Sequence, residues 1–113
     1  MHEVSLMEQT IEIALKWAQE QDAHTIHRFK MRIGKMSGVV PSALNFAFDV
    51  VTQGTIAENA TLEIETVPLI CYCDSCQMDF EADDIIYQCP LCGNISYKVK
   101  SGQEIELTSL EIS

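Results

Sequence analysis

Four of the five cysteines in this 113-residue chain have the spacing of a metal-binding site. Cys73 and Cys76 form one C-x2-C pair. Cys89 and Cys92 form a second pair after twelve intervening residues. Two thiolates three residues apart can reach one metal ion from a tight loop, and two such loops complete a tetrahedron. Gly93 follows the second pair, where glycine permits a positive φ and backbone amides can point at the sulfurs. The first pair is followed by Gln77 and makes a less ideal loop.

The same spacing leaves other chemistry open. Two disulfides would use the same residues, and a rubredoxin-like electron carrier would bind iron with similar loops. We expect zinc, because four thiolates with no open coordination position suit a structural ion. Such a site stabilises a fold and does not catalyse a reaction.

The cysteines also mark out a small lobe at residues 71–100. This segment contains few large apolar side chains, so metal binding, worth about 10–16 kcal/mol in comparable peptides, would have to fold it. The fifth cysteine, Cys71, is expected to be a half-buried side chain where the chain enters the lobe. The alternative is that it replaces one of the four metal ligands during metal exchange. The acidic residues between the two pairs are expected to form a solvated hairpin face: Asp79, Glu81, Asp83 and Asp84.

The first three residues offer a second kind of metal chemistry. A bulky His2 should leave Met1 in place, with a free amine one residue before an imidazole. The amine, the amide nitrogen and ring nitrogen of His2, and the amide nitrogen of Glu3 could chelate an ion in a plane. Square-planar nitrogen sets favour Ni2+ or Cu2+ over Zn2+. On its own, a histidine at position 2 is usually an exposed residue without a function.

The composition restricts the partners. Seventeen acidic and seven basic side chains give a net charge of −10, which argues against nucleic acids and anionic membranes. There is no apolar run long enough for a membrane span and no signal-peptide start, so we expect a cytoplasmic protein.

No Ser-His-Asp arrangement, phosphate loop or HExxH motif is present, which predicts that the chain is not an enzyme. His24 and His27 are expected to be surface residues.

The rest of the chain predicts an α+β body. A capping box of Ser5 and Glu8 predicts a helix over residues 5–20, and Pro41 opens a second helix that runs to about residue 53. Residues 27–35 alternate as a strand whose outer face is basic, either a solvated face or a docking patch for an acidic partner. Residues 61–67 and 104–112 are strands with acidic outer faces, the second with a slip at Thr108 and Ser109.

The two acidic strands flank the cysteine lobe, and we expect them to pair antiparallel so that the lobe is an insertion. The predicted fold is therefore α+β, with two helices, a three-stranded sheet and an inserted zinc-ribbon-like lobe. Residues 1–70 and 101–113 would form the nickel-binding domain, and residues 71–100 the zinc-binding domain.

The combination resembles the HypA/HybF family of nickel metallochaperones. The resemblance rests on Met1-His2-Glu3 before a helix, the α+β body, and the two cysteine pairs inserted late, and it covers the whole chain. It implies Ni2+ bound as cargo at Met1, His2 and Glu3. It also implies structural Zn2+ held by four residues: Cys73, Cys76, Cys89 and Cys92. Cys71 has no place in the family pattern.

The resemblance further implies delivery of nickel to the large subunit of [NiFe]-hydrogenase, with a hydrogenase maturation GTPase as collaborator. The resemblance does not determine whether the protein also acts in urease maturation, nor its oligomeric state. The competing interpretation is a zinc-ribbon module that binds protein or nucleic acid and transfers no nickel. The acidic charge and the absence of an aromatic stacking platform oppose the nucleic-acid form of that alternative.

Overall fold

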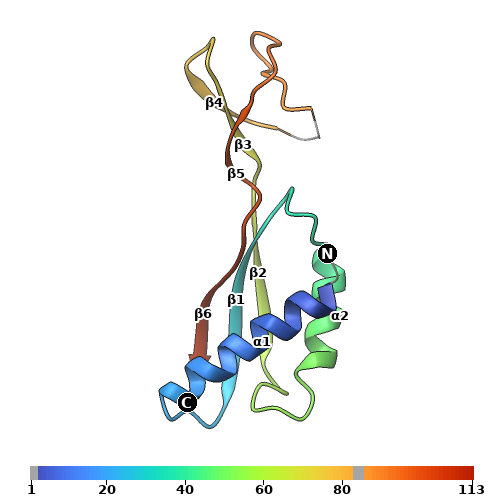
Figure 1. Cartoon of the computed structure of the whole chain (residues 1–113), viewed down its shortest axis with the longest axis vertical. Helices are drawn as coiled ribbons and strands as arrows, with labels where there is room; N and C mark the ends of the chain where they lie inside the picture. The colour runs from blue at the N-terminus through green and yellow to red at the C-terminus, as the bar shows by residue number, and fades with distance from the viewer. Residues whose placement is uncertain (1–2, 83–85) are drawn as a thin grey trace.

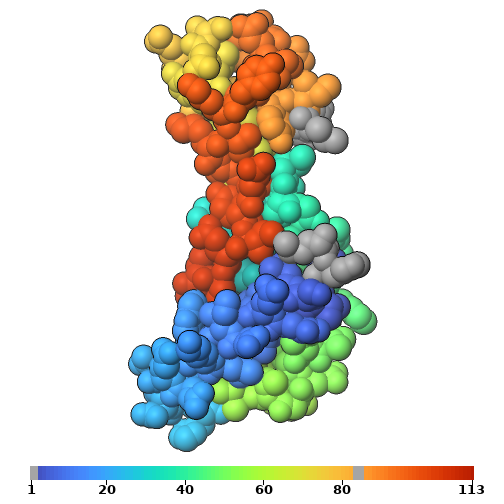
Figure 2. Space-filling model, viewed as in Figure 1, coloured from blue at the N-terminus to red at the C-terminus, as the bar shows by residue number. Residues whose placement is uncertain are grey.

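The computed structural model describes residues 3–82 and 86–113 of an elongated molecule with extents of 54 × 24 × 17 Å. Its radius of gyration, 17.4 Å, exceeds the ~13 Å of a compact chain of this length. The elongation arises because two three-stranded sheets lie at opposite ends of the long axis (Figure 1). The molecule is narrower between the two sheets than at either end, as the space-filling view shows (Figure 2).

The larger sheet belongs to the body of the molecule. Its strands are β1 (Ile26–Gly34), β2 (Thr61–Val67) and β6 (Ile105–Ile112), in the order β2-β1-β6. The central strand β1 runs parallel to β2 and antiparallel to β6. Helices α1 (Glu3–Glu20) and α2 (Pro41–Val51) pack against each other beside this sheet (Figure 1). These elements confirm the predicted α+β body with two helices and a three-stranded sheet.

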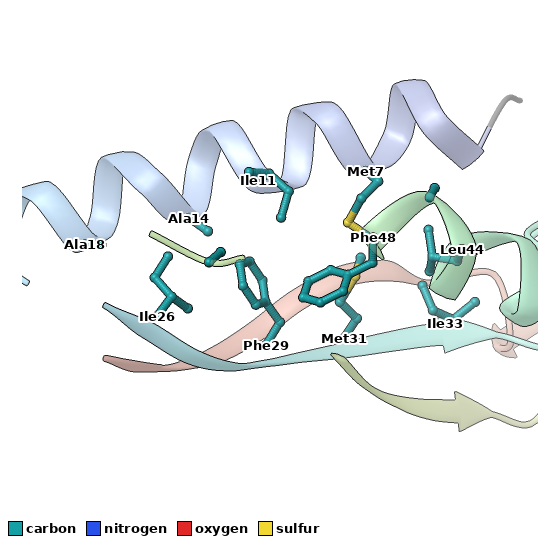
Figure 3. Close-up of a cluster of buried hydrophobic side chains, with 12 residues drawn as sticks. Met7, Ile11, Ala14, Ala18, Ile26, Phe29, Met31, Ile33, Leu44 and Phe48 are labelled. Atoms are coloured by element: carbon teal, nitrogen blue, oxygen red, sulfur yellow. The ribbon is translucent and has the colours of Figure 1, made fainter. Parts of the chain in front are cut away.

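The core of the body lies between the helices and β1. Phe29, Met31 and Ile33 alternate along β1 and are almost fully buried, as the period of a half-buried strand requires. Figure 3 shows Met7 and Ile11 of α1 above these side chains, with Phe48 of α2 beside Phe29. The Phe29 and Phe48 rings meet edge to face, with centroids 5.1 Å apart. The remaining buried members are Ala14, Ala18, Ile26, Leu44, Ala47 and Ala57.

The opposite face of the sheet carries the basic residues that the sequence placed on β1. Because β1 is central, Arg28, Lys30 and Arg32 face carboxylates from both neighbouring strands. The ion pairs, at 2.9 to 3.9 Å, join Arg28 to Glu63 and Glu111, Lys30 to Glu65, and Arg32 to Glu65 and Glu106. Pairs this exposed add little stability, but they neutralise the basic face. The arrangement favours a solvated face over a docking patch for an acidic partner.

Two details of the body correct the sequence predictions. The acidic strands do not pair with each other, because β1 lies between them and bonds to both. Alternation along a strand predicts which residues are buried but not which strand lies next to it. Helix α1 begins at Glu3, so Ser5 is an exposed residue of the first turn and does not cap the helix.

The predicted slip in the last strand is confirmed. The register with β1 shifts between the pairs Lys30–Ser109 and Met31–Leu107, which leaves Thr108 as the extra residue of a β-bulge. The Thr108 hydroxyl donates a hydrogen bond to the Lys30 carbonyl at 3.1 Å.

The smaller sheet holds the cysteine lobe. Its strands are β3 (Ile70–Cys73), β4 (Met78–Glu81) and β5 (Lys98–Ser101), in the order β4-β3-β5 with all neighbours antiparallel. The predicted hairpin is formed by β3 and β4, and the Asp79 carboxylate accepts a hydrogen bond from Lys100 at 3.0 Å. The acidic pair predicted after it, Asp83 and Asp84, lies outside the described residues. The lobe's buried cluster consists of Leu69, Cys71, Cys73, Phe80, Ala82 and Cys89.

Residues 34–36, 67–70 and 101–104 form the junction between the sheets, which we call the waist. Backbone hydrogen bonds cross it: Gly34 N–H donates to Glu104 O at 2.7 Å, and Met36 N–H donates to Gly102 O at 2.8 Å. The Met36 side chain packs against the buried cluster of the cysteine lobe. The waist is therefore hydrogen-bonded structure that continues from one sheet to the other.

Candidate metal centre

The four cysteines predicted as ligands come together. Cys73 ends β3, Cys76 lies in the turn that follows, and the other two belong to the turn at residues 89–93. The Sγ atoms of Cys73 and Cys92 are 3.5 Å apart, and those of Cys76 and Cys89 are 4.0 Å apart. All four sulfurs lie within 4.8 Å of one another. A tetrahedral ion with Zn–S bonds of about 2.3 Å requires sulfurs about 3.8 Å apart, so the set fits zinc.

In both turns, the residue after the cysteine pair has a left-handed backbone conformation, with positive φ, which helps to reverse the chain. Gly93 has φ of 77°, as its position after the second pair predicted, and its N–H donates to Cys89 O at 2.9 Å. Gln77 takes the corresponding place after the first pair, with φ of 53°. A side chain in this region is strained, which agrees with the expectation of a less ideal first loop. The Asn94 side-chain amide donates to Ser75 Oγ at 2.7 Å and ties the two turns together, a contact that the spacing did not reveal.

The metal-free thiols do not titrate alike. The backbone N–H of Cys92 points at the Cys89 sulfur and lowers the pKa of Cys89 to about 7. The hydrogen bond with the Cys92 thiol, together with burial, raises the pKa of Cys76 to about 12. A cation is the partner that lets all four sulfurs become thiolates at once, because metal binding displaces the protons.

Cys71 lies outside the cluster of four. Its side chain is fully buried in β3, opposite Phe80 of β4 and Val99 of β5, whereas the sequence predicted a half-buried position. Burial raises the pKa of the Cys71 thiol above its ordinary value. Its surroundings are those of a small apolar side chain in the core of the lobe.

The second predicted site falls largely outside the described residues, since Met1 and His2 are not among them. Glu3, the third residue of that set, is the first residue of α1. Its Oε2 atom accepts a hydrogen bond from the backbone N–H of Val40 at 3.3 Å. The structure therefore places one member of the proposed nickel set beside the beginning of α2.

The other histidines are exposed, as expected. His27 Nε2 is hydrogen-bonded to Ser113 Oγ at 2.6 Å, and the His24 N–H donates to Ser113 O at 2.7 Å. Within the described residues, the four cysteines form the group of at least three metal-binding side chains that could hold one ion. In the same part of the chain, no helix is long and apolar enough to span a bilayer.

Comparison with known proteins places these features in one family. The family model described as hydrogenase/urease nickel incorporation, metallochaperone, hypA matches residues 1–112. The hydrogenase maturation factor HypA of Picosynechococcus sp. is 52% identical over 112 residues, covering 99% of both chains. That of Roseiflexus sp. is 43% identical and covers 98% of this chain and 91% of its own.

Solved structures agree with the sequence relatives. The solution structure of the nickel metallochaperone HypA from Helicobacter pylori matches with a TM-score of 0.68 at 27% identity, over 99% of this chain and 97% of that one. A second solution structure, of a HypA protein, matches with a TM-score of 0.73, also at 27% identity, over 100% and 97%. The chain belongs to the HypA family of nickel metallochaperones for hydrogenase maturation, which are not enzymes.

Proposed function

We propose that this chain binds Ni2+ through Met1, His2 and Glu3 and delivers it to the large subunit of [NiFe]-hydrogenase during maturation. The observation that carries the proposal is the full-length match to a family of nickel-incorporating metallochaperones, over residues 1–112. That match includes the N-terminal residues on which the nickel site depends. A hydrogenase maturation GTPase is the proposed collaborator, and the cytoplasm is the proposed location.

We further propose that Cys73, Cys76, Cys89 and Cys92 hold a structural Zn2+ ion. The sulfur separations of 3.5 and 4.0 Å support a tetrahedral ion, and four thiolates leave no open position for exchange. In this proposal residues 71–100 are a zinc-binding domain inserted into a nickel-binding domain of residues 1–70 and 101–113. The zinc ion would stabilise the small cluster around Leu69 and Phe80, which is too small to fold alone.

The two sites differ in what they can release. A closed set of four thiolates holds its ion from every side, so transfer would require a ligand to leave first. A planar set of backbone nitrogens and one imidazole is open above and below the plane, where a partner's ligands can attack. The N-terminal set is therefore suited to carry cargo, and the cysteine set to maintain structure.

Metal analysis of the untagged protein after addition of nickel tests the proposal. One zinc and one nickel per chain are expected, and the nickel-loaded protein should transfer nickel to a purified hydrogenase large-subunit precursor. A protein that contains zinc but no nickel would overturn the proposal of a nickel carrier and would favour a zinc-ribbon module that binds protein or nucleic acid. Iron in place of zinc, visible as a red iron-thiolate absorption, would overturn the zinc assignment.

A further inference from the structure

The cysteine lobe carries a surface hollow beside its four sulfurs. The hollow has a volume of about 380 Å3 and is lined by residues 72–75 and 94–97. Figure 2 shows these two segments, in yellow and orange, side by side at the end of the molecule. Cys73 belongs both to the lining of the hollow and to the group of four sulfurs. A group that enters the hollow would therefore lie next to the metal centre.

Hydrogen bonds fix the two segments that form the hollow. The Asn94 side-chain amide donates to Ser75 Oγ at 2.7 Å, and Ser96 Oγ donates to the Tyr72 carbonyl at 2.5 Å. Ser96 is buried, and its backbone N–H donates to Tyr87 O at 2.7 Å. The hollow is thus formed before any partner arrives, which lowers the entropic cost of filling it.

The side chains around the hollow suit a cation with an apolar neighbour. Tyr97 is 92% exposed and Ile95 is 45% exposed, so both present apolar surface to solvent. The Asp74 carboxylate is also exposed, and it pairs with Lys98 at 3.0 Å. Lys98 Nζ lies 5.6 Å from the centre of the Tyr72 ring. This surface therefore already holds one cation between a carboxylate and an aromatic ring.

We propose that the hollow binds an arginine side chain of a partner protein, presented by a short segment with apolar residues on either side. A planar guanidinium can stack on the Tyr97 ring while it donates hydrogen bonds to the Asp74 carboxylate. The Cys73 sulfur is a further acceptor, and it is strongest as a thiolate. The apolar neighbours of the arginine would cover Ile95. A volume of about 380 Å3 is near the lower end for ligand sites, which suits one long side chain.

The charge of the chain supports this occupant over others. None of the residues that line the hollow is a lysine or arginine, so an anionic group would meet Asp74 and the sulfurs without a compensating cation. The net charge of −10 attracts a basic partner. A second copy of this chain is a poorer occupant, because its arginines, Arg28 and Arg32, are held in ion pairs on the body. The proposal does not depend on nickel.

A pair of blocked peptides tests the proposal with the full chain and no nickel. Acetyl-Leu-Arg-Leu-amide should bind saturably and shift the amide resonances of residues 72–75 and 94–97. The same peptide with citrulline in place of arginine keeps the shape without the charge, and it should bind at least about five-fold more weakly. Absence of binding, equal affinity for the two peptides, or shifts confined to the body would overturn the proposal. Changes in these resonances on dilution of the protein alone would identify a second copy as the occupant and would also overturn it.

Substitutions in the lobe locate the binding. Asp74→Asn and Tyr97→Ala should each weaken binding of the arginine peptide about two- to five-fold, as expected for an exposed ion pair and a cation–π contact. Asp79→Asn is the matched control for the charge, because Asp79 is another exposed aspartate that pairs with a lysine of β5, Lys100, but it lies outside the hollow. Met78→Ala is the control for exposed apolar surface. Neither control should change the affinity, and all four variants should keep the zinc content of the parent. An equal loss of affinity in Asp79→Asn would show general attraction by acidic charge and would refute the hollow as the binding site.

Discussion

Gly34 and Gly102 approach so closely that no side chain fits between them. A Cβ atom on Gly34 would lie 2.1 Å from the carbonyl oxygen of Gly102, and one on Gly102 would lie 2.6 Å from Cα of Leu69. These neighbours are backbone atoms, which cannot rotate away as a side chain can. The end of β1, the segment before β3 and the segment before β6 thus meet backbone to backbone at the waist.

Substitution of Gly34 by alanine should destabilise the protein by about 2–3 kcal/mol, because strands must separate to admit the methyl group. Gly38→Ala is the control, since nothing lies within 4 Å of its Cβ position and only its φ of 85° is unfavourable. That cost is about 1 kcal/mol. Urea denaturation of both variants measures the difference. Equal midpoints would show that the waist adjusts without strain.

Cys73→Ser should remove zinc and disorder the cysteine lobe while much of the helical body remains folded, because the body has its own buried core. Cys71→Ser should retain one zinc per chain, since Cys71 lies outside the sulfur cluster. Its buried position predicts a modest loss of stability instead. Zinc content by elemental analysis and protection of the lobe amides test both. Full zinc in Cys73→Ser would refute the assigned ligand set.

His2→Ala should abolish specific nickel binding without changing the zinc content or the thermal unfolding of the nickel-free protein. The reason is that His2 precedes the first residue of α1, and the body's core is made by residues from Met7 onward. Calorimetric titration with nickel and a thermal melt are sufficient. A melt that falls together with nickel binding would mean that His2 has a structural role.

Two residues added before Met1 would convert the terminal amine into an amide while leaving His2 and Glu3 in place. We expect the extended protein to keep its zinc and its fold but to bind nickel more weakly, or in a six-coordinate form. The comparison is a nickel titration of extended and unextended protein, followed by the visible absorption of square-planar nickel. Identical spectra and affinities would exclude the amine as a ligand.

The waist should weaken in acid through Glu104. Its own backbone N–H and that of Gly102, which lies 2.7 Å from Oε1, lower the pKa of Glu104 below its ordinary value of 4.5. Because the pKa is lower in the folded state, the stabilisation is complete above about pH 4.5 and is lost as the pH falls through the folded value. The difference in stability between the parent protein and Glu104→Gln isolates this group. That difference should be constant from pH 7 to 5 and should shrink as the pH falls below 4.5. A difference independent of pH would exclude the carboxylate as its source.

The sequence was sufficient for those features that depend on spacing along the chain. The four cysteines, the positive φ of Gly93, the bulge at Thr108 and the bounds of β2 followed from local pattern. The features that it missed depend on contacts between distant segments. Ser5 has the residue type of a cap, but α1 already includes Glu3, whose carboxylate accepts a hydrogen bond from Val40, 37 positions away. Nothing near Gly34 in the sequence indicates that Gly102 will lie against it.

The central position of β1 has a consequence for the order in which the chain assembles. Lys30 must find Thr108, 78 residues later, before the body's sheet is complete. Pairing of Ile70 with Ser101 brings the two ends of the cysteine lobe together. It thereby shortens the effective loop between β1 and β6. Loop closure costs conformational entropy that grows with loop length, and distant pairings form slowly. If the cysteine lobe folds first around its metal ion, β6 is brought close to β1. Metal binding by the lobe would then set the rate at which the sheet of the body is completed.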